Sequence, residues 1–497
     1  MTTLLGAVDL GAQSGRVAVG RLEGGRLTVE EVHRFANVPV LADGTLYWDV
    51  LRLYADVLDG LRATRRIGPV ASVAVDSWAV DFGLVDRRGS LLRNPVHYRD
   101  GRRAAAVDAV FERVPARELY ERTGIQLLPI NTIFELAALA AAGDPALAAA
   151  GRLLLVPDLF HHWLCGSEVS ERTNATTTQC LDVRTGTWLD DILERLGVPT
   201  GLLPEIVPPA TVLGTLAKEV AEETGIGEPR VVAAATHDTA SAVAAVPLHG
   251  DRCAYMSVGT WSLVGVEAHR PVLSDDAFRA NVTNEGGVGG TVRVLRNVTG
   301  LWLLHECSRA WSLAGRPHSI DDLVELARSA PPLRSFVDPN DPVFAEPGDM
   351  PARIAGYCAR TGQVRPEDEG AVVRCILESL ALKHAESIEL LASVTGRDID
   401  EIHIVGGGAN NDLLCRWTAD ACGRAVLAGP AEATLVGNLL VQALALGEIA
   451  SLSEAREIVR SSFAPGVYEP AEASVWREAR ERFTALTTSR DAMGVGA

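Results

Sequence analysis

A strand–turn–strand pattern occurs twice in this chain and constrains its fold more than any other feature. The first copy lies in residues 4–34, where apolar alternation is broken by glycine-containing turns, and the second lies in residues 253–269. Their turns align: Asp9-Leu10-Gly11-Ala12-Gln13-Ser14 matches Ser257-Val258-Gly259-Thr260-Trp261-Ser262. Glycine and serine are common in turns anyway, but one copy near the start of each half favours a duplication. We therefore expect two lobes, residues 1–247 and 248–497, with a cleft between them.

Length and element order predict the fold class. A chain of 497 residues is too long for one core, and about 150 residues per domain suggests two to four units. Predicted helices alternate with predicted strands, which favours an α/β class. The expected helices lie near residues 48–65, 102–113, 134–141, 240–246, 376–396 and 413–422, and the expected strands near 70–76, 82–85, 230–235 and 402–405.

Composition excludes several kinds of partner and site. With 46 basic and 64 acidic residues the net charge is −18, so we expect neither nucleic acid nor a membrane as partner. The N-terminal sequence has no signal-peptide pattern, which predicts a cytoplasmic protein. The eight cysteines include no C-x-x-C pair, and we expect buried free thiols rather than a zinc site. Only two lysines occur, Lys218 and Lys383, and neither lies in a glycine-rich loop, which excludes a P-loop.

The turn of the first meander is a candidate phosphate site. Its glycines allow several backbone N–H groups to point at one oxyanion, and Arg16 stands beside them. Asp9 ends the preceding apolar strand and is placed to hold a hydrated Mg²⁺ through water. An ordinary hairpin with a surface arginine remains the alternative for this motif taken alone.

The stretch VVAAATHDTASAVAAVP, residues 231–247, places a polar pair inside an apolar run. A buried strand is expected to end at Ala235 and a helix to begin near Ala240. Ligands bind at the carboxyl ends of strands in open α/β sheets, so Asp238 is a candidate proton acceptor near a helix N-terminus. The alternative is that Asp238 or Thr239 caps the helix and His237 is a satisfied loop residue.

Two further clusters carry polar side chains, and the first has what a sugar site needs, planar hydrogen-bonding groups and an aromatic face. An exposed polar hairpin is the alternative for the first of them. Their members are Asp76, Ser77, Trp78, Asp81, His97, Arg99 and Asp100 in the first, and Asn281, Asn284, Glu285, Asn297 and His305 in the second.

Ten motifs in sequence order resemble the rhamnulokinases, a group within the FGGY carbohydrate kinases of the actin-like ATPase superfamily. They run from residue 8 to about 440 and are VDLGAQSGR, VDSWAVDFGLVD, HYRD, VPDLFHHWLCG, ERTNATTTQCLD, THDTASAV, SVGTWSL, RNVTGLWLLHE, VGGGANNDLL and GPAEATLVGN. The resemblance implies two ribonuclease-H-like domains flanking the cleft. It assigns the sugar and the first phosphate loop mainly to residues 1–247, and ATP with Mg²⁺ mainly to residues 248–497.

The resemblance also implies residue roles. Asp238 matches the general base, and the sugar contacts are Ala79, His237, Asp238, Thr239 and Asn297. The nucleotide contacts are Ala12, Gln13, Ser14, Gly15, Arg16, Thr260, Gly407 and Gly408, with His305 standing where the family's glutamine is expected. Ala79 also departs from an expected glycine, which leaves slightly less room beside the sugar.

The activity implied is transfer of the ATP γ-phosphate to the 1-hydroxyl of L-rhamnulose by a monomer or homodimer. A kinase of L-fuculose, xylulose or a related ketose or polyol is the alternative within the same fold. A non-enzymatic sugar sensor and an actin-like chaperone ATPase are alternatives of another class. The intact phosphate motifs beside Asp238 argue against the sensor, and the polar cluster at residues 76–81 argues against the chaperone.

Overall fold

The computed structural model describes residues 2–491, which fold as two compact units. Unit 1 comprises the chain up to Pro247 together with Glu267–Val294 and Ala433–Phe463. Unit 2 comprises Leu248–Val266, Leu295–Glu432 and the chain from Ala464 onward. The chain first crosses from unit 1 to unit 2 after Pro247 and returns to unit 1 at Glu267 and again at Ala433.

Unit 1 is built on a six-stranded sheet of order β11-β12-β6-β1-β2-β3. The antiparallel meander expected from residues 4–34 is present as β1 to β3. Strands β1, β6 and β12 are parallel neighbours, so their carboxyl ends lie at one edge of the sheet. The strands are β1 Thr2–Leu10, β2 Ser14–Glu23, β3 Arg26–Ala36, β6 Ser72–Ser77, β11 Thr211–Thr215 and β12 Arg230–Ala233.

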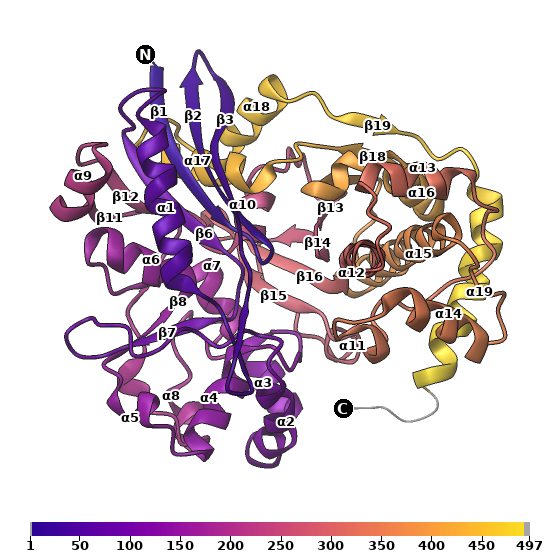
Figure 1. Ribbon diagram of the computed structural model, residues 1–497, viewed down its shortest axis with the longest axis horizontal. Coiled ribbons are helices and arrows are strands. Elements are labelled where there is room, and N and C mark those ends of the chain that lie inside the picture. The colour runs from indigo at the N-terminus through magenta and orange to yellow at the C-terminus, as the bar shows by residue number, and fades with distance from the viewer. Residues whose placement is uncertain (1, 492–497) are drawn as a thin grey trace. The chain divides into compact units, whose positions relative to one another are not determined.

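Helices cover both faces of this sheet (Figure 1). On one face, Val57 and Phe160 of α1 and α6 pack with Val8 and Val73 of the strands. On the other face, α10 and α17 pack against the small side chains of β6 and β12. Strand residues alternate between the two faces, which explains why successive residues of β6 belong to different cores. The helices are α1 Val50–Thr64, α6 Val156–Cys165, α9 Lys218–Thr224, α10 Asp238–Ala244, α17 Ala433–Ala445 and α18 Leu452–Ser462.

A separate helical layer with its own hydrophobic core lies between β6 and β11 in the sequence. Phe82, Phe134 and Leu153 are among its fully buried side chains. Its elements are β7 Phe82–Val85, α2 Gly101–Arg113, α3 Ala116–Thr123, α4 Thr132–Ala141, α5 Pro145–Ala149, β8 Arg152–Leu155 and α8 Asp190–Arg195. Short elements complete unit 1: β4 Val40–Ala42, β5 Thr45–Tyr47, β9 Ser170–Glu171, α7 Arg172–Ala175, β10 Ile206–Val207, α11 Asp275–Arg279 and β15 Thr283–Gly286.

The sheet of unit 2 repeats the connectivity of unit 1. The order of this seven-stranded sheet is β15-β16-β14-β13-β17-β18-β19. In both sheets a central strand, β1 or β13, pairs antiparallel with the next strand and parallel with a later one. A second parallel strand and an antiparallel edge strand follow in each. The duplicated α/β architecture expected from the two turns is therefore confirmed.

Helices also accompany the sheet of unit 2, where α15 extends over 27 residues (Figure 1). The strands are β13 Cys253–Val258, β14 Trp261–Ala268, β16 Val292–Thr299, β17 Glu401–Val405, β18 Ala425–Ala428 and β19 Gly466–Tyr468. The helices are α12 Trp302–Leu313, α13 Ile320–Ser329, α14 Met350–Arg360, α15 Glu369–Thr395, α16 Asp412–Cys422 and α19 Ala473–Asp491.

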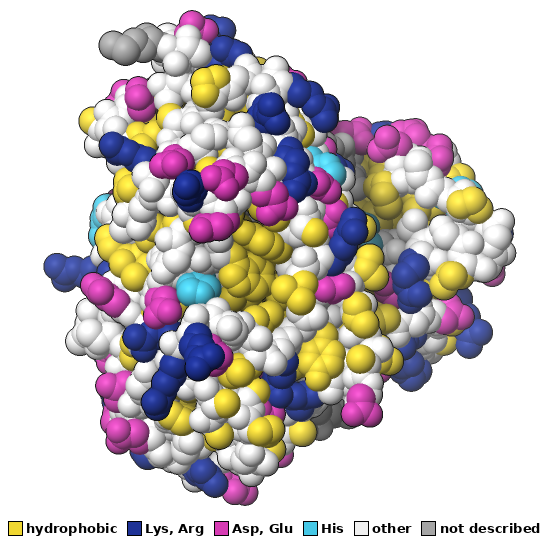
Figure 2. All heavy atoms as spheres, turned by 60° about the vertical axis from the view of Figure 1, so that its left-hand side comes forward, with side chains coloured by type: hydrophobic (Ala, Val, Ile, Leu, Met, Phe, Trp, Pro, Cys, Tyr) yellow, Lys and Arg dark blue, Asp and Glu magenta, His cyan; other side chains and the backbone are white. Residues whose placement is uncertain are grey.

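All eight cysteines are free thiols, and seven of them are buried, as the sequence predicts. Among the described residues no helix combines the length and apolarity needed to cross a bilayer. Figure 2 shows acidic and basic side chains interspersed over one face of the molecule, with hydrophobic side chains gathered near its centre.

Candidate active site

Three carboxylates gather at the carboxyl ends of the parallel strands of unit 1. Asp9 is in register with Asp76 on the neighbouring strand. The backbone N–H of Ser77 donates to the carbonyl of Thr236 at 2.9 Å, which brings the end of β12 and the following Asp238 to the same edge. Ligands bind at this edge in open α/β sheets. The sequence expectation for the location of Asp9 and Asp238 is therefore met by the strand topology.

Asp238 is the first residue of α10, and His237 occupies the N-cap position. Its side chain is 29% exposed and accepts a hydrogen bond from Thr239 Oγ1 at 3.0 Å. Burial, followed by the negative charge of Asp9, raises the pKa of Asp238 to about 7. A carboxylate with such a pKa is partly ionised at neutral pH and can both take up and release a proton.

His237 is a neutral imidazole whose tautomer is determined by Arg293. A guanidinium N–H of Arg293 faces Nδ1 of His237 at 3.0 Å, and arginine can only donate. Nδ1 therefore accepts, and the ring proton lies on Nε2, which is 3.4 Å from Oδ1 of Asp238. Burial and then the charge of Arg293 lower the pKa of His237 well below its usual value.

Arg293 is itself fully buried and has two further acceptors besides His237. Its Nε donates to the carbonyl of Gly286 at 2.8 Å, and its terminal nitrogen lies 3.2 Å from Glu285. Glu285 belongs to the second polar cluster expected from the sequence, whereas Arg293 was not among the expected residues. An arginine inside the apolar strand VRVL is the signal that could have identified it, because an unpaired buried charge is costly.

The β1–β2 turn carries the predicted first phosphate loop. Its backbone is closed by the Gly11 N–H, which donates to the carbonyl of Ser14 at 3.0 Å. A Cβ on Gly15 would lie 2.2 Å from the ring of Phe35, so glycine is required there. Ala12, Ser14 and Arg16 are half-buried, and Gln13 is exposed.

Arg16 is paired with the buried Asp9 across this turn. Both Nε and a terminal nitrogen of Arg16 lie 2.9 Å from Oδ2 of Asp9. Burial raises the pKa of Asp9 despite this guanidinium. The pair places one positive and one negative group side by side at the mouth of the turn.

Asp76 is held by a helix that follows it by some 360 residues. Asn438 of α17 donates to Oδ2 of Asp76 at 2.5 Å, and Gln442 donates to Asn438 at 2.7 Å. Burial and the nearby Asp9 raise the pKa of Asp76 well above its usual value, so a neutral carboxyl group is favoured. Asp76 thus lies beside the other two acids with its side chain fixed by Asn438.

Glu171 fixes the segment that leads from β12 to His237, by accepting two hydrogen bonds from Thr236. Both the backbone N–H and the hydroxyl of Thr236 donate to Glu171 Oε2 at 2.9 Å. The hydroxyl of Thr173 accepts from the His237 N–H at 3.3 Å. Sequence reasoning assigned no role to Glu171 or Thr173, although both lie in the motif ERTNATTTQCLD.

The polar cluster of residues 76–100 corrects one sequence expectation, because several of its members are buried supports. Asp81 is 1% exposed and accepts from Trp48 at 2.5 Å and from Trp78 at 2.9 Å, and it is also paired with Arg103. His97 stacks on Trp48 at a centroid distance of 4.0 Å. Their hydrogen-bonding groups are used inside the fold, not offered to a ligand. Ala79, half-buried, begins the turn that this network holds in place.

Unit 2 gathers a second set of predicted residues at the carboxyl ends of its own parallel strands. Thr260 lies in the β13–β14 turn, and Gly407 and Gly408 follow the neighbouring β17. A Cβ on Gly408 would lie 2.4 Å from Val258, whereas one on Gly407 would meet nothing within 4 Å. The backbone at Gly408 therefore lies too close to Val258 of β13 for any side chain, whereas position 407 has room for one.

His305 and Asn297 complete the set in unit 2. Asn297 is half-buried on β16, and His305 is half-buried in the first turn of α12. Burial lowers the pKa of His305. The helix start is joined to the β13–β14 turn, because the Gly300 N–H donates to the Thr260 carbonyl at 3.0 Å. The turn at Thr260 and the beginning of α12 are thus linked by backbone hydrogen bonding.

Comparison with known proteins decides the family. Two family models match almost the whole chain: the N-terminal domain of the FGGY family of carbohydrate kinases matches residues 4–245, and its C-terminal domain matches residues 254–446. The chain belongs to the FGGY family of carbohydrate kinases. The rhamnulokinase of Bacteroides thetaiotaomicron is 41% identical over 478 residues, which are 96% of this chain and 98% of the relative. The rhamnulokinase of Enterococcus faecalis is 41% identical over 93% of each chain.

Solved structures of other FGGY-type kinases share the fold at low identity. The gluconate kinase of Lactobacillus acidophilus superposes with a TM-score of 0.81 at 17% identity, covering 98% of each chain. The ligand-bound xylulose kinase of the same organism gives 0.81 at 17%, covering 99% of each chain. The fold class expected from the sequence, and the resemblance on which it rested, are confirmed. This FGGY kinase uses ATP to phosphorylate a carbohydrate.

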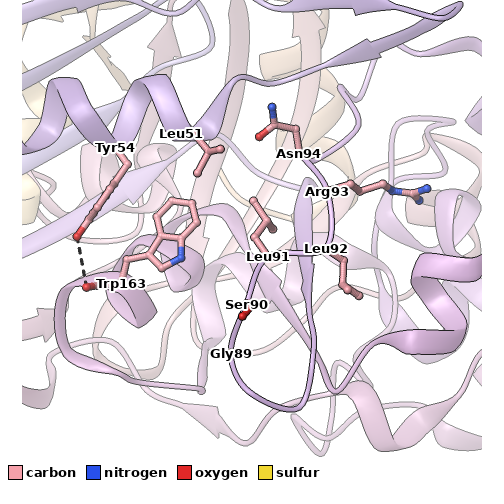
Figure 3. Close-up of a pocket in the computed structure, with 9 residues that line it drawn as sticks. All are labelled: Leu51, Tyr54, Gly89, Ser90, Leu91, Leu92, Arg93, Asn94 and Trp163. Carbon is pink, nitrogen blue, oxygen red and sulfur yellow. Dashed lines mark hydrogen bonds between the residues drawn. The ribbon is translucent and has the colours of Figure 1, made fainter.

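One cavity of unit 1 lies apart from the residues named above. Its volume is about 650 Å³, and Leu51, Tyr54 and Trp163 supply its apolar wall (Figure 3). The opposite wall is the loop that contains residues 89–94. None of the predicted catalytic, sugar or nucleotide residues lines it, so it is not part of the candidate active site.

Proposed function

We propose that this FGGY kinase transfers the γ-phosphate of ATP to the 1-hydroxyl of L-rhamnulose, giving L-rhamnulose 1-phosphate and ADP. The names of the relatives that match over almost their whole length support this choice of ketose. The observation that carries the reaction type is the position of Asp238, a half-buried carboxylate at the start of α10, at the sheet edge where β1 and β6 end with Asp9 and Asp76 nearby. Burial and the charge of Asp9 raise its pKa to about 7. We infer that the enzyme acts in the cytoplasm.

The sugar side of the proposed reaction depends first on Asp238. Asp238 accepts the proton of the attacking hydroxyl, which makes the sugar oxygen a better nucleophile for the in-line displacement. His237 offers its Nε2 proton beside that carboxylate and orients a sugar hydroxyl. Thr239, the backbone at Ala79, and Asn297 are the remaining proposed sugar contacts. Residues 1–247 thus form the domain that mainly binds the sugar.

The nucleotide side relies on backbone groups and one guanidinium. The turn from Ala12 to Arg16 and the turn at Thr260 are proposed to hold the phosphates, as expected for a chain without a P-loop lysine. Gly407 and Gly408 are proposed to lie against the adenosine, and His305 to contact the nucleotide. We propose residues 248–497 as the mainly ATP-binding domain, with the first phosphate loop supplied by residues 1–247.

Mg²⁺ is the proposed metal of the ATP complex. The carboxylate of Asp9 fits it, because Mg²⁺ prefers oxygen ligands and usually keeps several waters. The ion would neutralise charge that develops on the transferred phosphoryl group. Asp9 would hold it through water, and Arg16 beside Asp9 would add a second positive charge.

Two measurements test this proposal. ADP release from a panel of ketoses should be fastest with L-rhamnulose, and preference for L-fuculose or xylulose would replace the substrate. Asp238→Asn should abolish turnover while ATP affinity stays within about tenfold of wild type. The matched control is Asp108→Asn, an exposed aspartate of α2, which should leave kcat unchanged. Near-normal turnover by Asp238→Asn would remove the assignment of the base.

A further inference from the structure

Four side chains of unit 2 converge at the start of two parallel strands, away from the strand ends that carry the proposed nucleotide residues. They are His249, Cys253, Glu401 and His403. Cys253 is in register with Glu401, and Tyr255 with His403, so these side chains project from one face of the β13–β17 pair. His249 belongs to the segment that precedes β13.

The donor atoms of this cluster are close enough to share one ion. All four lie within 4.8 Å of one another. Oε1 of Glu401 is 2.8 Å from Nε2 of His403, 3.7 Å from Nδ1 of His249 and 3.9 Å from Sγ of Cys253. A tetrahedral ion with bonds of about 2.0–2.3 Å needs donors about 3.3–3.8 Å apart. Side-chain shifts of about 1 Å therefore suffice to form that geometry.

From this arrangement we propose that the four side chains bind one Zn²⁺ in a tetrahedral site. Two imidazoles, one thiolate and one carboxylate are ligands that zinc uses, while Mg²⁺ prefers an all-oxygen set. The thiol of Cys253, which now donates to the His249 carbonyl at 3.3 Å, loses its proton to solvent when the Zn–S bond forms. The thiolate and the carboxylate then balance the charge of the ion.

The surroundings favour such a site. His403 is 2% exposed and Cys253 is buried, so half of the ligands are already ordered by the sheet. The side chain of His249 is 67% exposed, which leaves an entry path from solvent. The neighbouring guanidinium of Arg252 is paired with Asp398 and Asp400, so its charge does not oppose the ion.

The expected consequence is structural. The ion would join the segment that enters unit 2, through His249, to two strands of the sheet. The site cannot be recognised as a motif in the sequence, because two of its ligands, Cys253 and Glu401, are 148 residues apart. The sequence predicts no zinc site because no two cysteines form a C-x-x-C pair. That criterion detects only ligands that are close together in the sequence.

The test uses the full-length protein, stripped with a chelator and titrated with ZnCl₂ against a chromophoric competitor. One Zn²⁺ per chain should bind, and His249→Asn should weaken binding by at least about tenfold, the loss typical of even an outer partner. Because His249 is exposed, this variant should fold normally. His269→Asn replaces an exposed histidine outside the cluster and should bind as wild type.

Cobalt supplies a second readout that does not depend on activity. Co²⁺ bound at this site should show a thiolate-to-cobalt charge-transfer band, and Cys253→Ser should remove it. Failure of the wild type to bind zinc, or equal affinity in wild type and His249→Asn, would overturn the proposal. Neither result would bear on the kinase assignment, because these residues lie outside the proposed active site.

Discussion

Arg293 donates to Nδ1 of His237 at 3.0 Å, and this contact places the imidazole proton on the nitrogen nearest Asp238. The two residues are separated by 56 positions in the sequence, and both belong to unit 1. A permanent positive charge beside the ring also keeps the histidine neutral. Arg293 is therefore a positioning residue for the candidate site.

Replacing Arg293 by methionine tests this role. Loss of the donor frees the tautomer and removes the charge that lowers the His237 pKa, so the ring should protonate at a higher pH. We expect kcat/KM to fall by about 10- to 100-fold, equivalent to about 1.5–3 kcal/mol for a hydrogen bond to a charged group. The loss should be largest on the acid side of the pH profile.

Arg293→Lys is the matched control, because it keeps a charged donor. It should recover part of the activity and restore the shape of the pH profile. If Arg293→Met lowered activity equally at every pH, the effect would be structural and the positioning role would be wrong.

The pH dependence of wild-type turnover should report Asp238. Only the ionised carboxylate accepts a proton, so kcat/KM should rise with pH and level off above an apparent pKa of about 7. A carboxylate with its ordinary pKa would give a profile already flat at pH 6. Initial rates between pH 5 and 9 (about two units on each side of that pKa) separate the two cases.

The same residue should lower stability at high pH. Its pKa is about 7 in the folded chain and near 3.8 ordinarily, so the native state binds the proton more tightly than the unfolded state. This favourable contribution is present at low pH and is lost as pH rises from about 4 to 7. Asp238→Asn has no such loss, so its Tm should exceed that of wild type at pH 8 by more than at pH 5. A Tm difference that does not change with pH would contradict the raised pKa.

Gly437 allows α17 to contact α10. A Cβ at this position would lie 1.7 Å from the carbonyl oxygen of Ser241, and backbone cannot move aside easily. Gly437→Ala should therefore lower the free energy of unfolding, although alanine ordinarily favours a helix by about 1 kcal/mol over glycine. Gly356→Ala, in α14, meets only a flexible arginine end at 3.6 Å and should be neutral or stabilising. Equal effects of the two substitutions in denaturant unfolding would contradict the steric argument.

Gly407 and Gly408 should respond differently to the same substitution. Gly408→Ala is expected to lower Tm because its methyl group would overlap Val258. Gly407→Ala has free space and should leave Tm unchanged while raising KM for ATP, if the loop lies against the nucleotide as proposed. Unchanged KM in Gly407→Ala with normal Tm would remove Gly407 from the nucleotide site.

Local sequence patterns correctly predicted several helices and strands of the fold. The meander of β1–β3, helix α1, strand β17 and helix α16 with its terminal Gly423 all lie within two residues of the expected bounds or closer, because apolar period and turn chemistry are local properties. Asp238 was found for the same reason: a charged residue inside an apolar run is visible without knowing what surrounds it.

The hydrogen-bond and ion-pair partners of the polar residues depend on how distant segments pack together. These partners could not be predicted from local sequence patterns. A carboxylate such as Asp81 is a residue type common in sugar sites. In the folded chain, however, its oxygens accept hydrogen bonds from two tryptophans and pair with Arg103. Asn438 reaches Asp76 across 362 positions, which no local spacing predicts.

Residue types and their order thus established the family, the α/β duplication and the position of the proposed base. Only the folded chain decided the ionisation of Asp238, the tautomer of His237 and the convergence of His249, Cys253, Glu401 and His403. The physical reason is that hydrogen bonding, burial and coordination depend on distances in space. Those distances are set when strands far apart in the chain pair side by side.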